Sequence, residues 1–196
     1  GNRSIRLYHA VMKRLWLIFL APWIGCAAER TILMVDDQDV LFRAGTRRVL
    51  EKPVRHAANP LITEDKPWEM AIGWTSVHRD KSGKYQLWYQ AYAGKRAQLK
   101  THECVVCYAE SADGITFQKP DLGLFDFNGE KNTNIVLIGS GLYGDRYCNS
   151  VIVDVKEPDA AKRYKMLYYD WAKNAKGEVI AGLHLAFSPD GIRWVK

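Results

Sequence analysis

The amino-acid sequence predicts an all-β fold, and two observations carry this prediction. From residue 68 onward the chain consists of short runs of β-forming residues separated by polar turns, and the same order of runs occurs twice. The 196 residues are 47% hydrophobic and 12% aromatic, which provides enough apolar material for a packed core and no signature of disorder.

The first unit is expected to contain four short antiparallel strands. Aromatic and β-branched residues dominate these runs, and polar turns such as Asp80-Lys81-Ser82-Gly83 and Asp113-Gly114 separate them. The expected strands are residues 72–78, 84–92, 103–111 and 115–117.

The second unit repeats the first. Three segments recur in the same order, and the last of them carries the turn pattern Ser-x-Asp-Gly-x-x-aromatic in both copies. Such self-similarity at a fixed spacing indicates a repeat architecture. Residues 75–80 align with 149–154 at an offset of 74, residues 84–89 with 163–168 at 79, and residues 109–117 with 186–194 at 77.

A repeated antiparallel sheet of this size predicts a β-propeller. A single four-stranded sheet leaves both faces to be covered, and stacking sheets around an axis covers them. We therefore expect residues 68–196 to form part of a propeller, with blades at about 68–120 and 143–196, preceded by an N-terminal segment at 29–67. Two blades do not close a ring, so we expect the remaining blades in a longer protein.

The N-terminus resembles a secretory leader over residues 1–28. Lys13-Arg14 precedes an apolar run at 15–24 and small residues at 25–28, and residues 1–11 are expected to lie upstream of a natural start at Met12. A membrane-spanning helix needs about 20 apolar residues, so no span is expected. The protein is therefore predicted to be secreted or periplasmic, and lipidation at Cys26 is the alternative outcome for this segment.

The charge distribution argues against a nucleic-acid partner. The formal charge is +6, but four of the 28 basic residues and none of the 22 acids lie in the leader, so the remainder carries +2 without a basic stripe. No cofactor is expected, because the glycine-rich segment at 139–144 precedes a strand and not a helix. No metal site is expected either: Cys104 and Cys107 are expected to be buried strand thiols. Export permits disulfides among Cys104, Cys107 and Cys148, with the pairing left open.

A less favoured alternative concerns residues 31–50, which resemble the start of a response-regulator receiver. Ile32-Leu33-Met34-Val35 is followed by acids at Asp36, Asp37 and Asp39. Pro53 and Pro60 then interrupt the chain where a receiver would continue through alternating helices and strands. The acids are otherwise expected to be solvated.

Six segments carry a resemblance to a known family, at residues 56–61, 66–69, 107–115, 119–123, 128–136 and 163–166. They resemble secreted bacterial proteins related to glycoside hydrolase families 32 and 43. This resemblance covers residues 31–196 and implies a five-bladed β-propeller, with funnel carboxylates that hydrolyse O-glycosyl bonds of a poly- or oligosaccharide. The chain lacks the family's Trp-Met-Asn-Asp-Pro-Asn-Gly type of segment, which favours the alternative of a non-catalytic propeller that binds glycans or another protein.

The repeat also indicates where functional carboxylates are expected. The first strand of each propeller blade lies nearest the axis, and Glu69 and Asp145 come just before these strands, so they are the candidate catalytic residues. A sugar site also needs aromatic platforms and planar polar groups, although a mid-strand tryptophan more often packs between blades. The candidate substrate-binding residues are His56, Asn59, Trp68, Trp74, Arg146 and Asn149.

Overall fold

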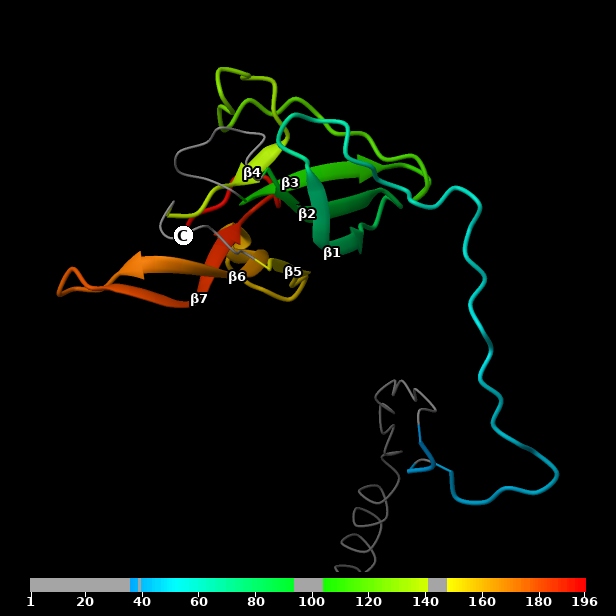
Figure 1. Cartoon of the computed structure of the whole chain (residues 1–196). Helices are drawn as coiled ribbons and strands as arrows, with labels where there is room; N and C mark the ends of the chain where they lie inside the picture. Colours follow the sequence, from blue (N-terminus) through cyan, green and yellow to red (C-terminus); the bar gives the residue numbers. More distant parts are fainter. Residues whose placement is uncertain (1–35, 39, 94–103, 141–147) are drawn as a thin grey trace, which may run out of the picture. The chain divides into compact units, whose positions relative to one another are not determined.

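The structure is a computed structural model, and it describes residues 36–38, 40–93, 104–140 and 148–196. The chain divides into two compact units, residues 1–52 and 53–196, and the second contains every described strand. The described residues form two antiparallel sheets and one short 3-10 helix, with no α-helix among them. The all-β prediction is confirmed (Figure 1).

The first sheet has four antiparallel strands in the order β1-β2-β3-β4. The hairpin of β1 and β2 closes at Asp80, whose Oδ1 accepts bonds from the Ser82 and Lys84 amides at 2.8 and 3.0 Å. Side chains of β2 and β3 are buried on both faces of the sheet, which explains why these strands are apolar without alternation. The strands are Ala71–Arg79 (β1), Tyr85–Tyr92 (β2), Cys104–Ser111 (β3) and Ile135–Leu137 (β4).

The fourth strand was expected at residues 115–117, and this prediction is wrong. Asp113 Oδ1 accepts bonds from the Ile115 and Thr116 amides at 2.8 and 2.7 Å, so these amides are not available to a β-ladder. Gln118 alone makes a bridge to Glu110, and the fourth strand forms later, at Ile135–Leu137.

The second sheet has three antiparallel strands in the order β5-β6-β7. A 3-10 turn, η2 (Ala160–Lys162), with Asp159 as its N-cap, lies between β5 and β6. The strands are Ser150–Val153 (β5), Tyr164–Lys173 (β6) and Val179–Ser188 (β7).

Equivalent residues of the two predicted repeats make equivalent hydrogen bonds. In the first sheet Glu110 bridges Gln118, and in the second Phe187 bridges Val195, each residue shifted by 77. The Ser-x-Asp-Gly turns also match, because Ser188 Oγ accepts from the Gly191 amide and Asp190 Oδ1 from the next two amides, as Ser111 and Asp113 do.

The two sheets pack against each other through one apolar cluster. The face of the first sheet that contributes Trp88, Val106 and Tyr108 is called the shared face here. It meets side chains of the second sheet, namely Met166, Tyr168 and Ala186. Trp88 also donates its indole N–H to the Gly191 carbonyl at 2.6 Å, which fixes the turn after β7 against the first sheet.

The opposite face of the first sheet, called the covered face here, is closed by other segments of the chain. It presents Leu87, Tyr89, Val105, Cys107 and Ala109, all of which are buried. Residues outside the named strands complete this cluster: Ile62, Trp68, Phe117, Phe125 and Phe127. Ile135 of β4 also belongs to it.

Residues 53–67 therefore belong with the sheets, whereas the described residues of 36–52 contain no helix or strand. Asp36 and Asp37 are exposed, and Asp37 forms ion pairs with Arg43 and Arg48. Exposed, paired acids agree with the solvated alternative to a receiver site. Asp39 lies outside the described residues.

Candidate functional site

The candidate site lies where β1 and β5 begin, and its most unusual residue is Trp74. Gly73 pairs with Gln90 and Ser76 with Trp88, so Trp74 and the residue after it oppose a single residue of β2. This extra residue is a β-bulge, and Trp74 adopts a left-handed conformation with φ of 45°. Its side chain is 59% exposed, so the indole does not pack between the sheets as expected of a mid-strand tryptophan.

The residue at the equivalent repeat position, just before β5 of the second sheet, is also left-handed. With the offset of 74, Trp74 corresponds to Cys148, which has a φ of 41° and is also exposed. A bulky residue in this conformation costs about 1 to 3 kcal/mol and persists only where its surroundings impose it. Its occurrence at one repeat position in both sheets indicates a recurring feature of the strand entrances.

Contacts between the sheets hold these two entrances together. The Val151 amide of β5 donates to Ser76 Oγ of β1 at 3.0 Å, and the Cys148 amide donates to Gln90 Oε1 of β2 at 2.8 Å. Trp74 lies directly beside Gln90 in the strand pairing, because its neighbour Gly73 is the partner of Gln90. The two left-handed residues are therefore anchored at a similar level of adjacent strands.

Asn149 adds a polar group whose hydrogen bonds are missing. The residue is 3% exposed, and neither its Nδ2 nor its Oδ1 has a hydrogen-bond partner. Leaving a buried donor or acceptor unpaired costs about 1 to 3 kcal/mol. Both carboxamide atoms are buried from solvent, so Asn149 marks a polar position that the described residues leave unsatisfied.

Glu69 does not lie in an open funnel as expected. Its side chain is 0% exposed, and Oε2 receives the Lys119 ammonium at 2.6 Å together with the amides of Asp65 and Lys66. Oε1 accepts the Tyr89 hydroxyl at 2.6 Å. The carboxylate is thus enclosed by four donors, and this geometry corrects the prediction that Glu69 faces substrate.

The environment of Glu69 also perturbs its neighbours. Burial raises the pKa of the Tyr89 hydroxyl well above its usual range, as do nearby Cys107 and the Glu69 charge. Burial, followed by the Glu69 charge, raises the pKa of the Cys107 thiol. Partial burial opposes ionisation of Asp65, but the hydrogen bond and charge of Lys119 outweigh it and lower the pKa. These groups form a structural network under the covered face.

Trp68 is a core residue and not a sugar platform. Its indole N–H donates to Asn134 Oδ1 at 3.1 Å, and its ring lies 5.5 Å from that of Phe127. Burial of this side chain closes the covered face, which corrects the expectation that Trp68 stacks on substrate.

His56 and Asn59 are bonded within their own exposed turn. His56 Nδ1 accepts the Ala58 amide at 3.2 Å, and the His56 carbonyl accepts both the backbone amide and the side-chain amide of Asn59. Asp145 and Arg146 lie outside the described residues. Of the five predicted substrate-binding residues that the structure describes, only Trp74 and Asn149 belong to the candidate site at the beginnings of β1 and β5.

Gln90 and Cys148 were missed by sequence reasoning. Gln90 binds the backbone of the neighbouring sheet, which no local pattern reveals. The repeat offset did carry a signal for Cys148, because it aligns this residue with Trp74. Cys104 and Cys107 are buried in β3, which confirms the expectation of strand thiols.

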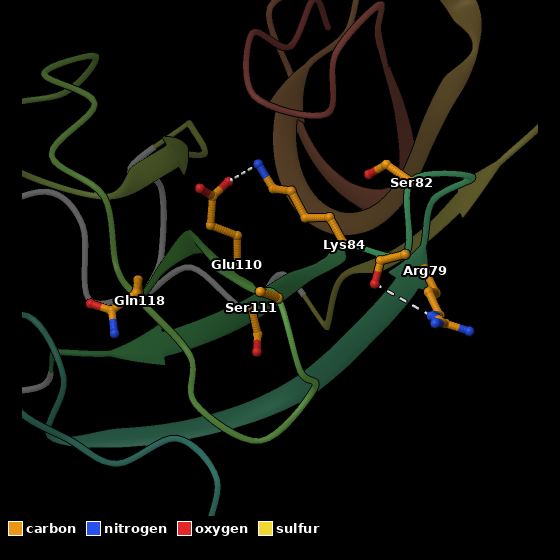
Figure 2. Close-up of a pocket in the computed structure, with 8 residues that line it drawn as sticks. Arg79, Ser82, Lys84, Glu110, Ser111 and Gln118 are labelled. Carbon is orange, nitrogen blue, oxygen red and sulfur yellow. Dashed lines mark hydrogen bonds and ion pairs between the residues drawn. The ribbon is translucent and has the colours of Figure 1, made fainter.

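A separate hollow of about 560 Å³ lies at the opposite end of β1, around the β1–β2 turn and the end of β3. Figure 2 shows Lys84 and Glu110 directed at each other across it, with Nζ and Oε2 2.5 Å apart. Arg79 donates to the Gly83 carbonyl at 3.3 Å and stacks 5.4 Å from the Tyr85 ring centre. Because these charged groups are paired with one another, the hollow is a weaker candidate ligand site than the beginnings of β1 and β5.

Comparisons with known proteins assign no family to this chain. No family model matches the chain, and no curated protein matches it. One solved structure, a BT0996 RGII complex, aligns at 14% identity with a TM-score of 0.25. The alignment covers 63% of this chain and spans 55% of the other. Among the described residues, no helix has the length and apolar character needed to cross a membrane, and no cluster of His, Cys, Asp or Glu is arranged to hold a metal.

Proposed function

We propose that the chain belongs to an exported carbohydrate-active protein that binds a poly- or oligosaccharide across the beginnings of β1 and β5. The observation that carries this proposal is Trp74, an exposed indole held in a left-handed conformation at a β-bulge. Indole faces stack on the CH-rich faces of sugar rings, and strained backbone is concentrated at functional sites. The expected five-bladed propeller would place both strand entrances at an axial funnel.

Asn149 supports the same ligand class. Its unpaired carboxamide lies at the beginning of β5, and both of its polar atoms are buried in the unbound structure. A pair of sugar hydroxyls would satisfy both atoms once the residues that cover them shift. The energetic penalty of the unbound state would then be released on binding, so the residue contributes to affinity and to orientation of the sugar.

Binding without catalysis is the second candidate function, and the enclosure of Glu69 favours it. A carboxylate that is held by Lys119, Tyr89 and two amides and is 0% exposed is not accessible to substrate. Hydrolysis of O-glycosyl bonds stays a prediction that now depends on Asp145 and on a second acid other than Glu69.

The test is a glycan panel screened with the full chain and three variants. Trp74→Ala should weaken binding to the best glycan by about 10-fold or more, since an aromatic stacking contact contributes about 0.5 to 1.5 kcal/mol beyond its area. Trp74→Gly should weaken binding equally and also raise the unfolding midpoint, because glycine relieves the left-handed strain. Val77→Ala, an equally exposed change on β1, is the matched control and should leave binding unchanged.

Equal binding by the wild type and Trp74→Ala would overturn the site. Hydrolysis is assayed in parallel with Asp145→Asn and Glu69→Gln: loss of turnover only in Asp145→Asn supports an enzyme, and absence of turnover in the wild type supports the binding function.

A further inference from the structure

The three cysteines among the described residues lie on different sides of the first sheet. Cys104 and Cys107 are both buried in β3. Side chains alternate along a strand, so a spacing of three residues places these two thiols on opposite faces. Cys104 belongs to the apolar cluster of the shared face, and Cys107 belongs to that of the covered face. The spacing in the sequence therefore does not bring their sulfur atoms together.

Cys148 lies on the same side of the first sheet as Cys104, because Gln90 contacts both residues. Gln90 Nε2 donates to Cys104 Sγ at 3.4 Å, and Gln90 Oε1 accepts the Cys148 amide at 2.8 Å. One carboxamide makes both contacts, and its nitrogen and oxygen are bonded to the same carbon. The Cys148 amide nitrogen and the Cys104 sulfur are thus separated by no more than an amide group and its two hydrogen bonds.

We propose that Cys104 and Cys148 form a disulfide that joins β3 of the first sheet to the residue just before β5 of the second. Cys148 is exposed and Cys104 is 2% exposed, so a small disulfide such as oxidised glutathione reaches Cys148 first. The Cys148 thiolate attacks one glutathione sulfur, and this step forms a mixed disulfide and releases one glutathione thiolate. The Cys104 thiolate then attacks the Cys148 sulfur and releases the second glutathione. Two protein thiols are oxidised, one glutathione disulfide is reduced, and the two departing thiolates take up the two protons.

The contacts of Gln90 are compatible with this bond. Cys104 contributes a sulfur acceptor and Cys148 a backbone N–H donor, so neither hydrogen bond uses a proton that oxidation removes. A disulfide joins Cα atoms about 4.4 to 6.8 Å apart, a span comparable with the one that the Gln90 carboxamide bridges. Cys107 does not compete for Cys148, because the first sheet lies between them.

The disulfide would also fix one side of the candidate site. Gly73, which precedes Trp74, pairs with Gln90, so the bond would hold Cys148 close to the exposed indole. Export, which the leader-like N-terminus predicts, would supply the oxidising conditions in which such bonds persist. The inference itself does not depend on the ligand that binds there.

The test uses the full chain with Cys26→Ser in every protein, so that the thiol of the predicted leader does not react. The reduced protein is incubated with oxidised glutathione, the remaining thiols are alkylated, and the peptides are identified by mass spectrometry without reduction. Cys148→Ser removes one partner of the proposed bond, and Cys107→Ala is the matched control that removes a thiol from the opposite face.

A peptide linked through Cys104 and Cys148 should form in the parent and in Cys107→Ala, and Cys104 should remain a thiol in Cys148→Ser. Oxidation should raise the urea midpoint of the parent by about 1 to 2 M, because the bond closes a loop of about 45 residues and restricts the unfolded chain. Four results would overturn the proposal: a Cys148–glutathione mixed disulfide that persists, a disulfide that includes Cys107, a disulfide-linked dimer, or an oxidised protein no more stable than the reduced one.

Discussion

Replacement of Gly191 by alanine should destabilise the protein more than the same change at other left-handed glycines. Gly191 has a φ of 77°, and a Cβ at this position would lie 2.5 Å from Trp88 Cζ2 and 2.9 Å from the Tyr164 ring. The same glycine's carbonyl accepts the Trp88 indole N–H. An added methyl must therefore displace two rings at the contact between the sheets.

The size of the destabilisation expected for Gly191→Ala follows from comparison with Gly177, a matched control. Gly177 has a φ of 81° and no atom within 4 Å of the position that an added methyl would take, so Gly177→Ala carries only the backbone cost of about 1 to 2 kcal/mol. Gly191→Ala carries the same backbone cost plus about 1 to 3 kcal/mol for overpacking. Gly114→Ala should fall between them, because its Cβ would meet the Tyr85 ring at 3.0 Å.

Urea unfolding followed by tryptophan fluorescence measures this difference. With a urea m-value of about 2 kcal/mol/M, an excess destabilisation of about 2 kcal/mol lowers the midpoint of Gly191→Ala about 1 M below that of Gly177→Ala. The m-values should agree, since the same surface is exposed on unfolding. Equal midpoints for the two variants would refute the close contact of Gly191 with Trp88 and Tyr164.

Three further predictions follow from the same structure. Glu69→Gln should lower the free energy of unfolding by about 3 kcal/mol in urea titrations, because it removes the buried partner of Lys119 and leaves that charge paired with the more exposed Asp65; unchanged stability would contradict the structural role. In the folded protein iodoacetamide should label Cys148 but not Cys107, whose thiol is buried with a raised pKa; peptide mass spectrometry reports the order, and early Cys107 labelling would count against it. The pKa of Asp190 is lowered because backbone amides and Ser188 outweigh its partial burial. The ionised Asp190 therefore stabilises the folded state above about pH 4, and this stabilisation is lost as pH falls toward the folded-state pKa. In Asp190→Asn the urea midpoint should fall less steeply with decreasing pH over this range.

The candidate site was predictable only in part, and particular residues show why. Trp74 and Asn149 were found because a sugar site needs an aromatic group and a planar amide near a strand entrance. Trp68 and Glu69 satisfied the same criteria, yet both are buried, because the segment before β1 folds over the covered face. Position relative to a strand does not reveal which side of the sheet a preceding segment will cover.

The fold, like the candidate site, was predictable only in part. The sequence by itself determined that two sheets of one repeat form, because runs of β-forming residues, turn residues and the Ser-x-Asp-Gly pattern act over a few neighbouring residues. It misplaced the fourth strand, since Asp113 removes the amides of residues 115 and 116 from pairing. Only the tertiary structure decided that Glu69 is enclosed, that Trp74 is exposed in a left-handed bulge and that Leu183 is open while Val106 is covered. These features depend on contacts between segments far apart in the chain, and such contacts are set by packing rather than by local sequence.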